Sequence, residues 1–179
     1  ASGGASNVID KHPFSSDGNA TDVGDLTTTR SSGGAQSSTS NGYTSGGSPL
    51  SDVIDKFPFS SDANATDVGD LTQARYGNAG QNSDTHGYTS GGRTPSARVN
   101  TVDKFSFSAD GNATDVGDLT VNRGDNPSGN SSTASGYTAG GFSPPSRNTI
   151  DKFPFAADGN ATDVGDLTQA KRGAAPHQV

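Results

Sequence analysis

The nonapeptide NATDVGDLT occurs four times in this chain without a change, starting at residues 19, 64, 112 and 160. Successive copies start 45, 48 and 48 residues apart, whereas the residues between the copies differ. A unit copied in tandem must fold so that each copy packs against the next one. The repeat therefore constrains the fold more than any other feature of the sequence does.

The repeat length and the segments within each repeat predict an all-β architecture. A period of about 40–50 residues is typical of β-propellers and of helical arrays. Helices are excluded because no window has apolar residues at helical spacing, and Gly and Pro interrupt every stretch. The third repeat instead contains four short segments between turn-rich stretches, at 121–128, 135–141, 148–155 and 160–167. Four short strands per period predict one propeller blade.

The composition narrows the class of protein. Only 27% of the residues are hydrophobic, the formal net charge is −7, and all 19 acidic residues are Asp. The acidic balance argues against nucleic acid as a partner. No apolar run approaches the about 20 residues of a membrane span, so membrane insertion is not expected. The chain begins with Ala1 rather than Met, which indicates a processed chain or a segment of a longer one.

The full repeats resemble kelch repeats. The likeness lies in an ordered set: an Arg that opens the first strand, an aromatic residue before a double glycine, an Ile-Asp-x-Phe strand, and a last strand ending in Leu. The matching residues are Arg75 and Arg123, then Tyr43, Tyr88 and Tyr137, then the glycine pairs 46–47, 91–92 and 140–141. The resemblance implies a β-propeller, although the Trp usual in the fourth kelch strand is absent. The amino-acid sequence of these repeats is also similar to that of repeat proteins of aquatic bacteriophages.

We expect residues 1–179 to form a single repeat domain. Its four repeats of about 45–48 residues span approximately 1–28, 29–73, 74–121 and 122–168, and 169–179 is a candidate closing strand. The opening "ASGG" is similar to the end of a second strand, so the two ends of the chain would complete one blade together. The result is a four-bladed propeller or part of a larger ring.

The fixed nonapeptide has three interpretations, of which the first is a calcium site. Oxygen groups at Asp17, Asn19, Thr21, Val23 and Asp25 follow the spacing of an EF-hand loop. The loop glycine and the closing Glu of that motif are missing, and the chain contains no Glu. We therefore predict no metal site and no dependence of the fold on calcium.

The second interpretation is glycosylation, because Asn-Ala-Thr is an acceptor sequence. The candidate acceptors are Asn19, Asn64, Asn112 and Asn160, with a further one at Asn130. The third and preferred interpretation is structural: the nonapeptide is the last strand of the blade with its entry turn. Its glycine indicates a close backbone approach or a bulge.

The Asp before each Lys of the "DK" pair shares a strand face with Phe and needs a partner. We expect that partner to be a backbone N–H or the Arg of a neighbouring strand. The residues concerned are Asp10, Asp55, Asp103 and Asp151.

No catalytic residues and no cofactor are predicted. The three His (His12, His86 and His177) occupy different repeat positions and do not form a metal set. No Gly-rich loop precedes a helix, so nucleotide binding has no support. The tripeptide Arg-Gly-Asp at 123–125 is explained by drift, because equivalent sites carry other residues.

The sequence predicts a non-enzymatic structural or adhesion protein at a virion surface or in the extracellular space. Its expected partners are other subunits of the assembly or host-surface glycans. Binding should lie in segments that differ between repeats, because loops on a rigid scaffold usually carry recognition. The candidate contact residues are Tyr76, His86, Arg93, Arg98, Phe142 and Arg147. The alternative is a carbohydrate-binding propeller in which Tyr43, Tyr88 and Tyr137, with His86 and Phe142, stack on sugar rings.

Overall fold

The computed structural model describes residues 4–173, and this part of the chain is all-β, with fourteen strands and no helix. No helix able to cross a membrane occurs within those residues. The all-β prediction is confirmed, and its cause is visible in the sequence: Gly, Ser, Thr, Asn and Asp disfavour helices and populate the turns between short strands.

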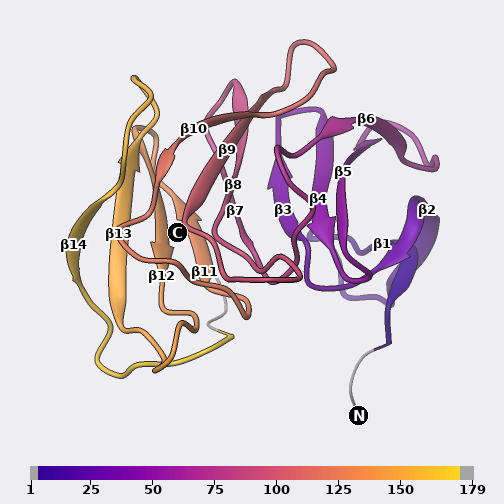
Figure 1. Ribbon diagram of the computed structural model, residues 1–179. Helices are drawn as coiled ribbons and strands as arrows, with labels where there is room; N and C mark the ends of the chain where they lie inside the picture. Colours follow the sequence, from indigo (N-terminus) through magenta and orange to yellow (C-terminus); the bar gives the residue numbers. More distant parts are fainter. Residues whose placement is uncertain (1–3, 174–179) are drawn as a thin grey trace.

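The strands form one two-stranded and three four-stranded antiparallel sheets (Figure 1). The first sheet pairs β1 (Ser6–Lys11) with β2 (Thr21–Arg30). The second contains β3 (Gly34–Ser37), β4 (Asn41–Gly47), β5 (Ser51–Pro58) and β6 (Thr66–Asp70). The third contains β7 (Ala79–Asn82), β8 (His86–Ser90), β9 (Thr101–Ser106) and β10 (Thr114–Asp118). The fourth contains β11 (Ser128–Ser131), β12 (Ser135–Ala139), β13 (Thr149–Pro154) and β14 (Thr162–Asp166).

Three of the four strands expected in the third repeat form where predicted, as β12, β13 and β14. The first does not: a strand was expected at 121–128, whereas β11 begins only at Ser128. Asp125 and Asn126 both have a φ of 59°. This left-handed conformation interrupts an extended chain and postpones the strand. For the expected closing strand, residues 169–173 form no strand, and 174–179 lie outside the described residues.

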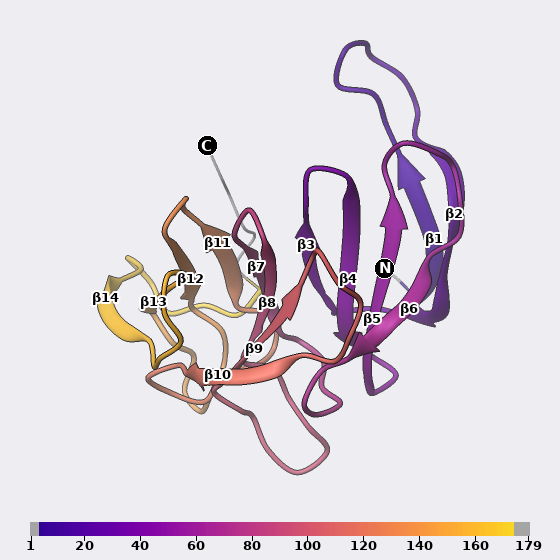
Figure 2. The ribbon, with the colours of Figure 1, turned by 90° about the horizontal axis from the view of Figure 1, so that it is seen from above.

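The four-stranded sheets lie side by side and fan out in an arc (Figure 2). The first strand of the third sheet, β7, contacts the first strands of the other two, β3 and β11, and these three strands form the inner edge of the arc. The last strands, β6, β10 and β14, form the opposite edge of each sheet. The pair β1–β2 lies at one end of the arc and β14 at the other.

The apolar side chains pack between neighbouring sheets rather than within one sheet. Between the second and third sheets, buried Tyr43, Ile54 and Leu71 meet Phe105 and Ala113. The ring of Tyr43 stacks on Phe107 with a centroid distance of 4.8 Å. The next pair of sheets repeats this cluster with equivalent residues, namely Tyr88, Val102, Leu119, Phe153 and Ala161. Each repeat therefore completes its core only against its neighbour, as expected for a tandem fold.

The glycine of the nonapeptide marks both a bulge and a close approach of two sheets, as predicted. The β9–β10 register shifts between Asp115 and Gly117. A Cβ on Gly117 would lie 2.4 Å from the carbonyl oxygen of Gly159 in the next repeat. Gly24 and Gly69 are placed in the same way, whereas Gly165 has nothing within 4 Å.

We predict that Gly117→Ala destabilises the fold more than Gly165→Ala. Both glycines have a φ of 150°, so the backbone strain of about 1–3 kcal/mol is common to the two variants. Only at position 117 must the neighbouring sheet also move, which costs a further ~1–3 kcal/mol. Urea unfolding of the two monomeric variants measures the difference in free energy of unfolding. Equal losses would contradict the close approach.

Candidate functional site

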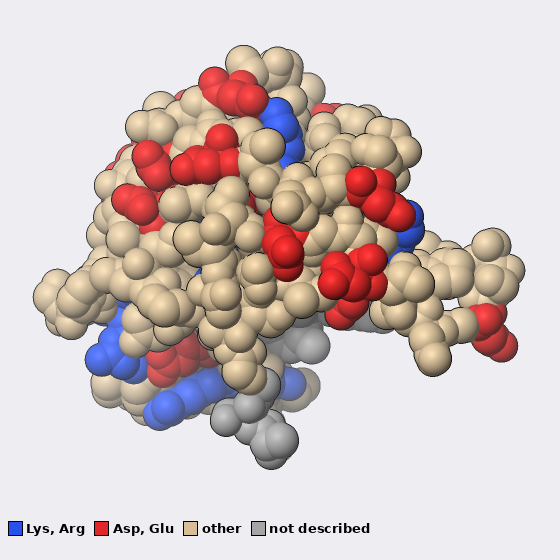
Figure 3. All heavy atoms as spheres, turned by 90° about the vertical axis from the view of Figure 1, so that its right-hand side faces the viewer, with Lys and Arg blue, Asp and Glu red and all other residues tan. Residues whose placement is uncertain are grey.

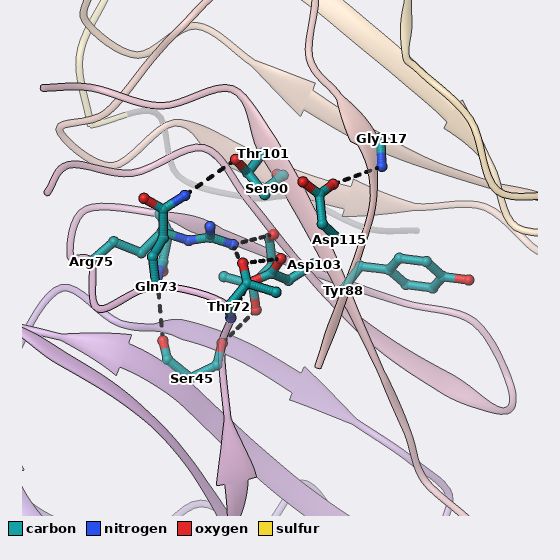
Figure 4. A network of polar contacts seen from close by, with 12 residues as sticks. Ser45, Thr72, Gln73, Arg75, Tyr88, Ser90, Thr101, Asp103, Asp115 and Gly117 are labelled. Carbon is teal, nitrogen blue, oxygen red and sulfur yellow. Dashed lines mark hydrogen bonds and ion pairs between the residues drawn. The ribbon is translucent and has the colours of Figure 1, made fainter. Parts of the chain in front are cut away.

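Three fully buried carboxylates are paired with guanidinium groups of arginines that lie in the preceding sheet or are hydrogen-bonded to it through their backbone. Asp55, Asp103 and Asp151 are each 0% exposed. They form ion pairs with three buried arginines, Arg30, Arg75 and Arg123 respectively. The Arg75–Asp103 pair spans 3.1 Å and appears in Figure 4. The expectation that each Asp finds an Arg of a neighbouring strand is confirmed for these three carboxylates.

A threonine completes each pair. The backbone N–H of Thr72 donates to Asp103 at 2.9 Å, and its hydroxyl donates at 2.7 Å (Figure 4). Thr27 and Thr120 do the same for the carboxylates of the other two pairs. Because N–H, hydroxyl and guanidinium groups occupy these carboxylate oxygens, they are not free to act as nucleophiles or general bases.

The arginines of these pairs also bind backbone carbonyls. Arg123 donates through Nη1 to Thr138, Gly140 and Thr149, which lie on strands 2 and 3 of the next sheet or just beyond. Burial lowers the pKa of Arg75 and Arg123, and the adjacent carboxylates oppose that shift. The arginine therefore ties the entry segment of each sheet to its interior.

The remaining polar residues of the nonapeptide join successive repeats. The side-chain oxygens of Asn64, Asn112 and Asn160 accept a hydrogen bond from an Asp backbone N–H of the preceding repeat, at 3.0–3.1 Å. The Asp after each Thr accepts from the glycine N–H two residues on. The structural interpretation thus explains why the sequence recurs. Asn19, Asn64, Asn112 and Asn160 are all exposed, and their glycosylation stays a prediction.

No group of three or more His, Asp or similar ligands is placed to hold a metal ion within residues 4–173. Two of the predicted sugar-stacking tyrosines are also out of reach of a sugar. Tyr43 and Tyr88 are each 2% exposed and pack against phenylalanines of the next sheet. Their rings are part of the core, so this part of the lectin hypothesis is wrong. Only Tyr137, which lies in the last sheet, is half-buried.

The six predicted contact residues divide between the two ends of the strands. His86 begins β8, in a small hollow with Asp84, Thr85 and Phe107. Burial, with a contribution from the Lys104 cation, lowers its pKa. The other five, Tyr76, Arg93, Arg98, Phe142 and Arg147, lie in segments beyond the opposite end, on what we call the arginine rim. His86 is therefore not part of one site with them.

Backbone hydrogen bonds fix the arginine rim. Tyr76 and Arg93 exchange backbone hydrogen bonds of 2.8 and 3.1 Å, although they belong to different segments. The N–H of Arg147 donates to the Gly141 carbonyl at 2.9 Å. The side chain of Arg93 is exposed, while those of Arg98 and Arg147 are half-buried. The rim thus presents guanidinium groups on ordered backbone.

A cluster around Phe142 is the densest part of the rim. The guanidinium carbon of Arg98 lies 4.4 Å from the ring centroid of Phe142, and that of Arg172 lies 3.4 Å from it. Both arginines approach Asp125, at 3.1 Å and 3.8 Å respectively. Cation–π contacts of this kind hold arginines in place.

Arg172 and Asp125 are members of this cluster that were not predicted from the sequence. A signal for Arg172 exists, because "QAKR" at 169–172 aligns with "QARY" at 73–76. The alignment places Arg172 at the position of Tyr76, on the same rim. Asp125 carries no such signal, since its place follows from the conformation of a segment that differs between repeats.

The inner strands enclose a separate cavity of about 520 Å³. It lies between β3, β7 and β11, and the residues that line it are Gly, Ala, Asn, Pro and Ser, such as Asn78, Asn82 and Asn126. None of these described lining residues is titratable. The cavity can offer amide and backbone hydrogen bonds but holds no group for acid–base chemistry.

Comparison of the chain with protein-family models found no match, and comparison with curated proteins found none either.

We predict that Asp103→Ala costs about 3–5 kcal/mol of unfolding free energy, because it leaves the Arg75 cation buried without its partner. Asp10→Ala is the matched control, since Asp10 holds the same repeat position but is exposed. The control should change stability by no more than about 0.5 kcal/mol. Urea denaturation of the monomeric variants measures both values, and a similar effect of the two substitutions would contradict the role of the pair.

We also predict a loss of stability above about pH 10. Burial raises the pKa of Tyr43 and Tyr88 above the ordinary value of 10.0. The folded state therefore favours the protonated phenol, and this contribution is complete below pH 10.0 and is lost as the pH rises through the folded-state pKa. Melting temperature recorded against pH should fall less steeply for the double variant Tyr43→Phe/Tyr88→Phe. If the melting temperatures of the wild type and the double variant fall in parallel with pH, the prediction is contradicted, and the loss of stability is due to deprotonation of lysines.

Proposed function

We propose that this chain is a non-enzymatic structural and attachment protein of a virion surface or another extracellular assembly, built on a kelch-like β-propeller scaffold. The observation that carries the proposal is that recurring and variable residues occupy different places in the structure. The residues that recur in the repeats bind one another within and between the sheets. Five of the six candidate contact residues, all of which differ between repeats, lie on the arginine rim.

The arrangement of the sheets supports a propeller scaffold. Each four-stranded sheet is an antiparallel meander, and the inner strand β7 contacts the inner strands β3 and β11. The double glycines carry positive φ values, as at Gly46 (66°) and Gly47 (131°). Gly46 approaches the Arg75 carbonyl so closely that a Cβ would lie 2.6 Å from it. The kelch-like signature therefore has a packing reason in this chain.

The chemistry of the rim supports an anionic partner. Arg93, Arg98, Arg147 and Arg172 all lie on the segments of the rim, while the chain as a whole carries a net charge of −7. A guanidinium offers several donors in a plane that fits carboxylate and sulfate groups. We therefore favour acidic glycans of a host surface, or an acidic face of another subunit, as what the rim binds.

A neutral-sugar lectin is the second candidate, but one observation weighs against it. The guanidinium groups of Arg98 and Arg172 lie over the ring of Phe142. A sugar could stack on that ring only by displacing a cation. The geometry thus favours charged contacts over aromatic stacking.

The test is retention of the protein on an immobilised sulfated polysaccharide, with neutral dextran for comparison. The variant Arg93→Ser/Arg98→Ser/Phe142→Ser/Arg147→Ser should bind at least about tenfold more weakly, a loss of about 1.4 kcal/mol or more. The wild-type chain should not be retained on dextran. Circular dichroism establishes that the variant still folds.

The matched control is Lys56→Ser/Lys104→Ser. These lysines pair with Asp110 and Asp158 near the opposite ends of strands β5 and β9. Removing them lowers the positive charge without touching the rim, so retention should persist. Unchanged retention of the four-residue variant, or retention of neither protein, would contradict binding through the arginine rim.

A further inference from the structure

The two ends of the arc expose surfaces whose counterparts between neighbouring sheets are buried or partly buried. The same five residues, TDVGD, form β6, β10 and β14. In β6 and β10 the last three are partly buried, whereas in β14 all five are exposed. Sequence and conformation are the same, so the difference reflects only the absence of a neighbouring sheet.

The contacts that cover this surface are known, because the chain makes them three times. The backbone N–H of an Asp donates to the Asn of the next repeat, as from Asp118 to Asn160 at 3.0 Å. The backbone carbonyl of the same Asp accepts a hydrogen bond from the N–H of the Ala that follows this Asn, as from Ala161 to Asp118 at 2.8 Å. A lysine pairs with an Asp of the next hairpin, as in Lys104–Asp158. A Thr and an Arg bind the buried carboxylate.

In the last sheet these donors have lost their acceptors, and we call this surface the trailing face. Lys152 corresponds to Lys104, and it forms no ion pair with any residue that the structure describes. Lys171 stands where Arg30, Arg75 and Arg123 stand, and it too has no ion-pair partner within 4–173. Asp166 and Thr168 are exposed, as is Val164 at 49%.

The first sheet presents the missing acceptors on what we call the leading face. Asp17 corresponds to Asp158, and Asn19 corresponds to Asn160. Asp10 corresponds to the buried Asp151 but is exposed. Ala20 is exposed too, whereas its counterpart Ala161 is 8% exposed.

The aromatic residues show the same pairing of faces. Phe155 stacks on Tyr88 of the preceding sheet with a centroid distance of 4.8 Å. Phe14 occupies the same repeat position as Phe155 but is 98% exposed. Tyr137 occupies the position of Tyr88 and is only half-buried. Each of these two rings lacks the partner that the other supplies.

We propose that the trailing face of one copy of this chain binds the leading face of a second copy, continuing the internal interface between repeats. Lys152 then pairs with Asp17, Lys171 and Thr168 bind Asp10, and the N–H of Asp166 donates to Asn19. The Phe14 ring packs on Tyr137. Because the two faces differ, the association is head-to-tail, and it forms a ring if its rotation closes.

Two features of the structure favour a second copy over the chain's own other end. The faces lie at opposite ends of the arc and do not meet within one chain (Figures 1 and 2). The side of the molecule that carries β1 and β2 shows acidic side chains gathered over its upper part (Figure 3). This distribution complements the lysines of the trailing face, and such complementarity fixes register.

The pair β1–β2 also shows that half a sheet suffices to pack on a complete one. It contacts the second sheet through Lys11–Asp62, Asp25–Asn64 and the Arg30–Asp55 pair. It contains only the counterparts of strands 3 and 4. The proposed interface joins the same outer half to the last sheet through counterparts of these contacts, with Lys171 in the place of the arginine.

The first experiment is analytical ultracentrifugation of the 179-residue chain over a range of concentrations. The mass should rise above 17.9 kDa with concentration. Phe14→Ser and Gly165→Ala should each weaken association by about tenfold, the first by removing a buried ring and the second by placing a Cβ against the partner backbone. Phe59→Ser is the matched control, because Phe59 is 51% exposed, belongs to the same motif, and lies outside both faces.

The second experiment exchanges charges across the interface. Asp17→Lys and Lys152→Asp place like charges opposite each other, and each variant alone should associate about threefold to fivefold more weakly. Mixed in equal amounts, they should form a mixed species in which one junction is wild type and the other has its charges exchanged. Circular dichroism of each variant excludes loss of folding as the cause.

A wild-type chain that stays monomeric at all concentrations would overturn the proposal, as would association that is unaffected by Phe14→Ser and Gly165→Ala. Charge variants that fail to associate with each other would exclude this register. Loss of association in Phe59→Ser to the same extent as in Phe14→Ser would show that the contact lies elsewhere.

Discussion

The buried ion pair that links one sheet to the next is the interaction on which the rest of this structure depends. The backbone of Arg75 forms hydrogen bonds with Gly47 and Ser51 of the second sheet, and its side chain reaches Asp103 in the third sheet. Both side chains of the pair are 0% exposed. The same geometry recurs for Arg123 and Asp151. Because neither charge can remain buried without the other, each sheet is specified only in the presence of its neighbour.

Such pairs are weak sources of net stability, since desolvation of two charges offsets their attraction. Their importance here lies in register. A chain with 27% hydrophobic residues has few apolar contacts to distinguish one packing from another. Polar side chains fix the register of the inner strands in the same way. Gln81, for example, donates hydrogen bonds to Ser90, Thr138 and the Tyr137 carbonyl. Hydrogen-bonded networks of this kind favour one arrangement of the sheets over its alternatives.

The proposed function follows from the residues that take no part in the contacts within and between the sheets. Carboxylates that occur once per repeat are engaged in pairs and turns, so their number does not indicate catalysis. The arginines that are not part of the buried ion pairs lie on one rim, where Arg98 and Arg172 are ordered by Phe142 and Asp125. The proposed self-association uses different surfaces, at the two ends of the arc. Attachment and assembly would therefore be separable by mutation.

The sequence by itself determined the repeat period, the all-β class, and the need of each "DK" aspartate for a cationic or N–H partner. These depend on local chemistry: turn residues, alternation, and the cost of burying a charge. The tertiary structure alone decided which copies of an identical residue are used in the same way. Tyr88 is a core residue and Tyr137 is not, and Asp103 is buried while Asp10 is exposed. The arginine cluster around Phe142 also became visible only in three dimensions, because it joins segments without a common pattern. The physical reason is the same in each case: burial belongs to a pair of neighbouring sheets, and a sequence repeat does not say which of its copies has a neighbour.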